Sequence, residues 1–347
     1  FLAVGKMLNR QAYVYNTLAA SAFLILLLDP LAMFKIGFQL SYSAVLFIVW
    51  LHPPIYRLIY LKNNLLDKAW SLTCVSITAT LGTFPLVVHY FHQFPVYFVL
   101  TNLIVIPLSF MIVSTGVVLL GLSFIEPMSQ ILTFLLKYLM MLLNHSVIFI
   151  EKLPGSTISG IYFSAFETLL IYLLIFISAT MLLNRNFYLL KQFALLVLFF
   201  MASLTYSHLN QLGRHEILIY NVNRGLAVDL IHGYKHYFLA DSASIYNDGL
   251  LDFNVRENWI KNGLAKPEMI NLDSLEQEYK TKNLYLDEDI ILFGNKKMLM
   301  IDGKRNISGM DSLDVDILIF HDDPRVKIQQ AFNKHQPELV ILSAGNS

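Results

Sequence analysis

Charged residues are scarce in this chain of 347 residues, of which 14% are Asp, Glu, Lys or Arg. A soluble protein of average composition has about 25%. Cysteine is rarer still: Cys74 is the only one, so no disulfide can form within the chain. The sequence therefore excludes a disulfide-rich secreted domain. With 56% hydrophobic residues and a mean hydropathy of +0.55, it also excludes a disordered chain and indicates membrane spans.

The few charges are unevenly distributed, although the formal net charge is zero. Residues 1–206 hold 10 basic and 5 acidic residues, whereas residues 207–347 hold 15 and 20. The first part also contains the long apolar runs. We therefore predict a membrane domain at 1–206, followed by a soluble domain at 207–347. Because the chain opens at Phe1 without a signal-peptide pattern, we expect the membrane domain to be truncated at its N-terminus.

Seven stretches approach the length of about 20 apolar residues that a spanning helix needs. They lie near 13–28, 38–51, 70–90, 96–124, 129–150, 161–183 and 187–206. Asp29-Pro30 separates the first two, so we expect a broken pair that does not span independently. The stretch 96–124 would reach about 43 Å as one helix, against a hydrocarbon core of about 30 Å. Since it also holds Asn102 and Pro107, we expect a kinked or re-entrant helix lining a cavity.

Lysine and arginine in the connections predict the orientation of the spans. With seven crossings, one face of the membrane receives six of these residues: Lys6, Arg10, Arg57, Lys62, Lys68 and Arg185. The other face receives only Lys35 and Lys152. The first face is therefore expected in the cytoplasm, which places the soluble domain outside it. A re-entrant fourth span would reverse this assignment downstream.

Polar residues inside spans are candidate functional residues, because they are costly in hydrocarbon. Lys137, Asn144 and His145 share one helical face, and Glu167 in the next span is a possible buried partner of Lys137. A structural contact between helices, or a lysine that snorkels to the headgroups, is the alternative. His89 and His92 also share a face, but no acidic third ligand is near them, which favours interfacial packing over metal binding.

Two sequence blocks carry a resemblance to a known family. The first is Asp29-Pro30 followed by Gly37-Phe38-Gln39-Leu40-Ser41 and Ala44. The second is Phe84-Pro85, then Phe91-His92-Gln93-Phe94-Pro95, then Asn102-Leu103-Ile104-Val105-Ile106-Pro107-Leu108. In order and spacing, the blocks resemble the competence domain of the ComEC family over residues 10–125.

This resemblance implies a multi-pass channel in the bacterial inner (cytoplasmic) membrane that imports single-stranded DNA during natural transformation. It also implies partners: a surface DNA receptor and a cytoplasmic helicase. The candidates for lining or kinking the channel are Gly37, Gln39, Ser41, Asn102 and Pro107.

Simple helix geometry limits what these residues do. Gln39 and Ser41 are two positions apart and point to different faces of a regular helix. Either the helix is irregular there, or one of the two binds a neighbouring helix. Asn102 could satisfy the carbonyl of Leu103, which Pro107 leaves without its donor. A role restricted to packing and kinking remains an equal alternative for the whole set.

Short alternating stretches in the soluble part predict strands. They lie at 216–220, 227–231, 236–240, 290–293, 297–301, 315–320 and 339–342, and they favour a mixed α/β domain with a sheet sandwich. The segment resembles a degenerate copy of the metallo-β-lactamase-like domain with which the ComEC family often ends, truncated at its C-terminus. The positions that match the family's motifs are Asn221–Leu226, Asp241, His321 with Asp322-Asp323, and the final strand running into Ser343-Ala344-Gly345-Asn346.

Metal-dependent hydrolysis in that fold needs a cluster of His and Asp, yet no histidine occurs between His236 and His321. The pairs His232/His236 and His321/Asp322 are weak candidates for a metal. We therefore expect no enzyme activity, no metal and no cofactor, and we interpret this acidic domain as a scaffold, gate or docking module. A small-solute or lipid transporter, or a membrane-tethered metallohydrolase, remains the alternative function.

Overall fold

The structure is a computed structural model that forms two compact units, Phe1–Met201 and Ala202–Ser347. It describes residues 13–347 apart from 223–224, 246–247, 252–254, 265, 275–277, 282, 288–289, 303–312, 323, 325–327 and 344–347. Lys6 and Arg10, which entered the orientation argument, lie outside the described residues.

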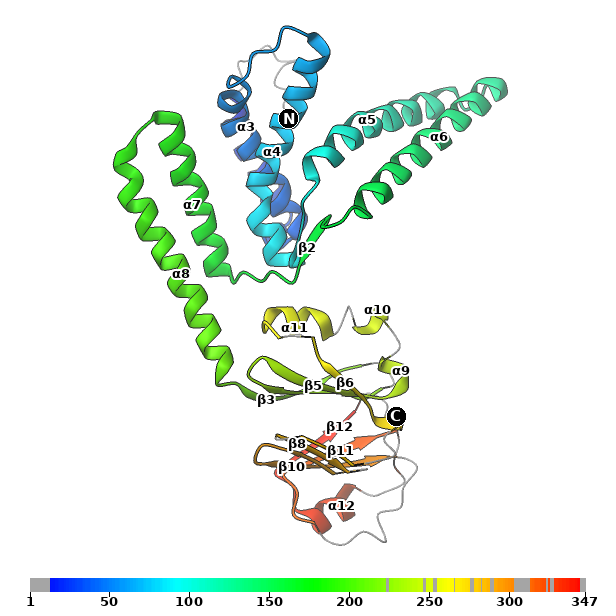
Figure 1. Cartoon of the computed structure of the whole chain (residues 1–347). Helices are drawn as coiled ribbons and strands as arrows, with labels where there is room; N and C mark the ends of the chain where they lie inside the picture. The colour runs from blue at the N-terminus through cyan, green and yellow to red at the C-terminus, as the bar shows by residue number, and fades with distance from the viewer. Residues whose placement is uncertain are drawn as a thin grey trace. The chain divides into compact units, whose positions relative to one another are not determined.

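Within the described part of the first unit, six helical segments are long and apolar enough to cross a membrane. They are α3 (Ile36–Tyr56), α4 (Asn64–Phe91), α5 (Phe98–Leu122), α6 (Glu126–Glu151), α7 (Ala165–Asn184), and η2 (Phe187–Leu189) continued by α8 (Leu190–Leu212) (Figure 1). A shorter apolar helix, α2 (Val14–Leu28), precedes them. Each of the seven predicted stretches overlaps one of these helices, so the polytopic helical domain is confirmed.

The break between α2 and α3 forms where the sequence predicts it. After Leu28 the chain enters a short 3₁₀ helix, η1 (Pro30–Phe34), whose cap is Asp29. The Asp29 carboxylate accepts a hydrogen bond from the backbone N–H of Leu31 at 3.1 Å and pairs with Lys35 Nζ at 2.6 Å. These contacts hold the two helices as separate segments.

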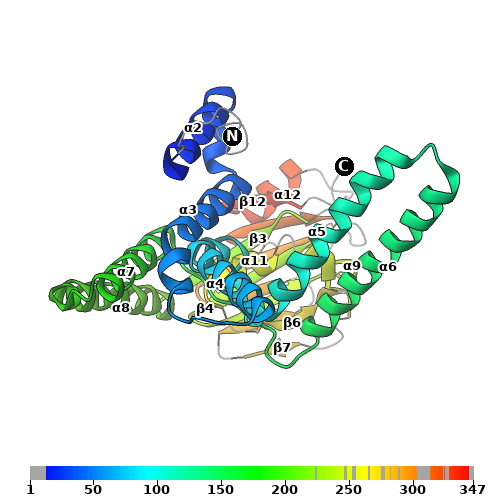
Figure 2. The same cartoon turned by 90° about the horizontal axis from the view of Figure 1, so that it is seen from above.

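Helices α3, α4 and α8 extend five or six residues beyond their predicted limits, and α5 differs from its predicted form. α3 continues through Pro53 and Pro54 to Tyr56, because its end is held against α4: Trp70 Nε1 donates to the Tyr56 carbonyl at 3.0 Å. α5 is a single helix from Phe98 to Leu122 with Pro107 inside it. The proline therefore does not divide this helix into a re-entrant pair, and α5 packs along α6 as a hairpin (Figure 2).

A small two-stranded sheet joins the connections on one side of these helices. β1 (Gln93–Pro95), which follows α4, pairs antiparallel with β2 (Thr157–Ser159), which lies between α6 and α7. The Val96 N–H adds a bond to the Ser156 carbonyl at 2.8 Å. Consequently the end of α4 and the connection into α7 lie together.

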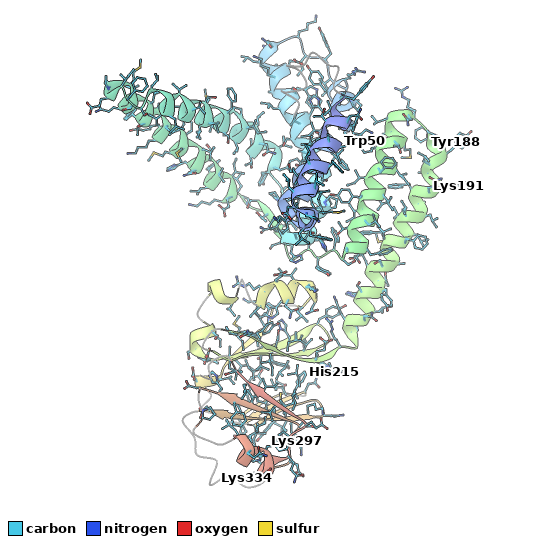
Figure 3. The ribbon with its side chains drawn as sticks, turned by 180° about the vertical axis from the view of Figure 1, so that it is seen from behind. Trp50, Tyr188, Lys191, His215, Lys297 and Lys334 are labelled. Atoms are coloured by element: carbon cyan, nitrogen blue, oxygen red, sulfur yellow. The ribbon has the colours of Figure 1, made fainter. Side chains whose placement is uncertain are left out.

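Helix α4 contacts α3, α5 and α7 and provides more buried residues than any other described helix of this unit. Cys74 and Val88 on α4 are fully buried. On the α3 side, Trp50 points toward α7 and stacks on Phe176, with ring centroids 5.2 Å apart (Figure 3).

The second unit contains two sheets. The four-stranded sheet has the order β3-β4-β5-β6, formed by β3 (His215–Tyr220), β4 (Ala227–His232), β5 (Lys235–Ala240) and β6 (Glu268–Asn271). The six-stranded sheet has the order β12-β11-β10-β9-β8-β7, formed by β7 (Tyr279–Lys280), β8 (Leu284–Asp287), β9 (Ile290–Phe293), β10 (Lys296–Asp302), β11 (Ile317–His321) and β12 (Leu339–Leu342). Short helices α9 (Ser242–Ile245), α10 (Asp248–Leu251), α11 (Glu257–Lys261) and α12 (Ile328–His335) complete it.

The strands alternate their side chains between two cores, as half-buried strands in a layered domain do. Val228 and Leu239 face Met298 and Ile319 in the core between the sheets. On the outer side of the four-stranded sheet, Phe238 packs with Trp259 of α11 and other residues. On the outer side of the six-stranded sheet, a third cluster includes Leu318, Phe320 and Ala331 of α12. This helix–sheet–sheet–helix order confirms the predicted sandwich.

Three described strands of the second unit were not predicted, namely β6, β7 and β8, and neither were β1 and β2 of the first unit. Within 256–282 the charged and apolar residues alternate without a clean period, and β6 buries only Ile270. β6 pairs parallel to β5, so its partner is distant in the sequence. No hairpin turn motif therefore indicates a strand at this position.

Candidate functional site

Several polar residues of the membrane helices bind groups on neighbouring helices, and one such group surrounds Gly82 of α4. Ser43 Oγ of α3 and Tyr172 OH of α7 both donate to the Gly82 carbonyl, the second at 2.7 Å. A Cβ atom at position 82 would lie 2.7 Å from the Ser43 carbonyl oxygen and 2.8 Å from Phe47 Cβ. Only glycine therefore allows α3 and α4 to approach this closely.

Gln39 lies next to this group. Its Nε2 donates to the Met33 carbonyl at 3.0 Å, and its Oε1 accepts from Tyr90 OH of α4 at 2.9 Å. Of the two alternatives predicted for Gln39 and Ser41, the structure shows a regular helix in which Gln39 binds a neighbouring helix, whereas Ser41 is exposed.

A cavity of about 460 Å³ opens beside these contacts. Its wall includes Gln39, Ser43 and Tyr172 as polar residues and is otherwise apolar, with contributions from η1, α3, α4 and α7. A largely apolar hollow with a few convergent polar groups is the usual form of a binding or passage site. This cavity is one candidate functional site of the membrane unit.

Asn102 binds differently from the prediction. Its Nδ2 donates to Ser76 Oγ of α4 at 2.7 Å, so the side chain joins two helices rather than satisfying the Leu103 carbonyl. The partner is 26 residues away in the sequence, which is why local reasoning did not find it. Pro107 and Gly37 are exposed, and nothing lies within 4 Å of the place that a Cβ on Gly37 would take.

The polar residues of α6 and α7 are not brought together as predicted. Lys137, Asn144 and His145 are all exposed on α6, and His145 Nδ1 lies 2.8 Å from the Met141 carbonyl. Glu167 is buried in a capping box at the start of α7, where its Oε2 accepts from the Ser164 N–H at 2.8 Å. Because Lys137 is exposed, the expected buried pair of Lys137 with Glu167 is wrong.

The histidines at the end of α4 are structural. His89 Nδ1 lies 2.7 Å from the Phe163 carbonyl, and the His92 carbonyl accepts from the Gly160 and Ile161 N–H groups. His92 ends the helix in the left-handed conformation, with φ of 56°. These contacts support the predicted packing role.

In the second unit, four segments that the resemblance matches to family motifs meet at one edge of the sandwich. His321, at the end of β11, has Nδ1 3.0 Å from Ser343 Oγ and Nε2 3.9 Å from Asp241 Oδ2. Asp241 follows β5 and also accepts from the Ser244 N–H at 2.9 Å. The Asn221–Leu226 segment reaches the same carboxylate through the Leu226 N–H.

The remaining motif positions and metal candidates are as follows. Residues 223–224, Asp323 and 344–346 lie outside the described residues. His232 and His236 have different partners: His232 Nδ1 lies 3.0 Å from His215 Nδ1, and His236 Nδ1 lies 2.6 Å from Asp229 Oδ1. Among the residues that the structure describes, no group of three or more His, Cys, Asp or Glu side chains is placed to hold a metal ion.

The helices and the layered domain together define a multi-pass membrane protein with a soluble α/β sandwich. The family described as "Competence protein" matches residues 1–185, and the one described as "ComEC C-terminal domain" matches residues 217–347. The first match covers more than half of the chain, which therefore belongs to the ComEC family of competence proteins.

One curated relative is similar to a third of the chain. It is "ComE operon protein 3" of Bacillus subtilis (strain 168), 33% identical over 123 residues, which are 34% of this chain and 15% of the relative. The aligned part is thus a small fraction of that protein. No solved structure matches the chain.

Proposed function

We propose that this chain forms part of an inner-membrane channel that imports single-stranded DNA during natural transformation. The observation that carries the proposal is the family membership over both units, because a competence protein with six or seven membrane helices is suited to moving DNA across the membrane. The membrane helices contribute the largely apolar cavity whose polar residues are Gln39, Ser43 and Tyr172.

The orientation of the helices supports an extracytoplasmic soluble domain. The β1–β2 pairing holds the end of α4 and the start of α7 on one side of the membrane, whether or not α5 and α6 both cross. The α3–α4 connection, with Arg57 and Lys62, is then on the opposite side, together with Arg185 between α7 and η2. If these cations mark the cytoplasm, α8 delivers the soluble domain to the other side.

We propose that the soluble domain is not a nuclease. The charge of the domain opposes binding to a polyanion, since it carries 20 acidic and 15 basic residues. Purified domain is expected to hold no stoichiometric zinc or manganese and to leave single-stranded DNA intact. About one ion or more per chain, lost on His321→Ala, would instead support the metallohydrolase alternative.

Deletion of the gene tests the proposed function. The deletion strain should bind DNA at its surface as the parent does but lose transformation, and the wild-type gene should restore it. An Asn102→Leu variant, which removes the bond to Ser76, should accumulate in the membrane and transform less well. Normal transformation of the deletion strain, with altered uptake of a small solute, would favour the transporter alternative.

A further inference from the structure

Helix α6 carries a row of polar residues at every seventh position. Gln130, Lys137, Asn144 and Glu151 follow one another at this spacing, which returns a helix to nearly the same face after two turns. The row spans about 31 Å, the thickness of the hydrocarbon core. Lys137 and Asn144 in the middle of the row were predicted as candidates. The seven-residue spacing also identifies Gln130 and Glu151 at its ends.

The row lies on the side of α6 that no described residue covers. All four residues are exposed, whereas the half-buried residues of the helix include Leu132, Leu136, Leu139 and Leu143 on the face packed on α5. A second exposed strip of the same helix is apolar and is formed by Ile131, Leu135, Leu142 and Phe149. The exposed surface of α6 thus has one side with the polar row, between whose members Phe134, Met141 and Ile148 are also exposed, and one apolar side suited to lipid.

Lys137 excludes the simplest account of the row, which is a helix surrounded by lipid. It is 11 residues from Glu126 and 14 from Glu151, so its Cα is about 16 Å from the nearer end of the helix. If the row marks the hydrocarbon core, Lys137 lies about 10 Å inside its nearer edge at Gln130, which is deeper than the helix ends where lysines commonly snorkel to the headgroups. An ammonium group at this depth faces protein or water.

The part of the row from Gln130 to Asn144 fits a polyanion in water, whereas Glu151 places a carboxylate at the far end of the row. Between Glu126 and Glu151 the helix has no acidic residue, and its single cation is Lys137. The amide side chains of Gln130 and Asn144 lie about 10 Å above and below it. One cation flanked by neutral donors gives weak contacts at several places, which a strand needs in order both to enter and to leave.

We propose that the α6 row from Gln130 to Asn144 lines the aqueous path of the transported strand, with Lys137 contacting phosphate within the membrane. The identity of the strand as DNA rests on the proposed function. The water-facing position of the row does not depend on the proposed function, and it can be tested separately.

Thiol labelling in cells tests the water-facing position. The full-length protein is used, with Cys74 and any other native cysteine replaced by alanine, and single cysteines are introduced at matched depths. The row variants are Gln130→Cys, Lys137→Cys and Asn144→Cys, and the lipid-side controls are Ile131→Cys, Leu135→Cys and Leu142→Cys. The probe is a membrane-impermeant trimethylammonium methanethiosulfonate, which reacts with the ionised thiol that only water supports.

The row variants should be labelled at least about tenfold faster than their controls. Equal labelling of both sets, or no labelling of either, would overturn the proposal. A disulfide between two copies of Lys137→Cys, with no labelling, would show that the row is instead a contact between copies of this chain.

Transformation tests the nature of the strand. Lys137→Glu should lower transformation at least about tenfold, because it places a negative charge against phosphate, and Lys137→Arg should retain it. If the row is labelled but the deletion strain transforms normally, the proposed function is wrong and the path carries another solute. If deletion abolishes transformation and the row is not labelled, the present inference alone is wrong.

Discussion

The most sharply testable part of the soluble domain is a carboxylate buried under α11. Asp229 of β4 is fully buried and accepts from three side chains. Trp259 Nε1 donates at 2.6 Å, Tyr220 OH at 3.2 Å and His236 Nδ1 at 2.6 Å. A buried charge of this kind is stable only while its partners remain.

The expected decrease in the free energy of unfolding depends on which polar groups each substitution leaves without a hydrogen-bond partner. Asp229→Ala removes the acceptor of the buried Trp259 indole N–H and of the buried His236 imidazole. It should therefore lower the free energy of unfolding by about 3–5 kcal/mol. Asp229→Asn keeps one acceptor oxygen and should cost about 1–2 kcal/mol. With a urea m-value of about 2 kcal/mol/M, the alanine variant should shift the unfolding midpoint by about 2 M.

Trp259 makes the measurement direct, because Trp50 and Trp70, the other two tryptophans, lie in the membrane unit. Its fluorescence reports urea unfolding of the purified domain of residues 207–347. Glu216→Ala is the matched control: Glu216 is in the neighbouring strand β3 and pairs with Arg214 at 2.8 Å, and its side chain is 40% exposed. This surface pair should contribute at most about 1 kcal/mol. If Asp229→Ala cost no more than the control, the reasoning from buried contacts would be refuted.

Three further outcomes are expected. Alkaline phosphatase fused after Asn210 should be active, and a silent fusion with an active cytoplasmic reporter at the same point would contradict the orientation. Gly82→Ala should reduce the amount of protein in the membrane, because its Cβ would strike α3, whereas Gly116→Ala, with open space around it, should not. The soluble domain should lose stability above about pH 10. Burial raises the pKa of Tyr220 and of Tyr279 in the folded state, so as the pH rises the phenols ionise first in the unfolded chain. Tyr220→Phe should therefore make the free energy of unfolding fall less steeply with pH above about pH 10.

The membrane helices were predictable because their signal is local. A run of apolar residues bounded by charged or turn residues fixes a helix regardless of its neighbours, so every span appeared within a few residues of its place. The exception at the end of α3 illustrates the limit. Pro53-Pro54 by itself predicts the end of a helix. The helix nevertheless continues to Tyr56, whose carbonyl accepts a hydrogen bond from Trp70 of α4.

Contacts between distant segments were not predictable in the same way. The partner of Asn102 is set by the packing of α4 on α5, and the meeting of His321 with Ser343 depends on the parallel pairing of β11 with β12. Resemblance to a family marked Asp241 and His321 as motif positions, but only the sheet order brings their side chains to one edge. Residue type and spacing give the list of candidates, and topology decides which of them meet.

The two kinds of polar residue in the membrane unit point to different roles. Gln39, Ser43 and Asn102 all bind groups on α4, which is the normal way to place polar atoms in hydrocarbon. The α6 row differs, since Gln130, Lys137 and Asn144 are exposed although they belong to a helix of membrane-spanning length. Hydrocarbon does not supply hydrogen bonds to these side chains, so something else does. The α4 contacts therefore hold the helices together, and the α6 row is the surface on which a molecule crossing the membrane should be sought.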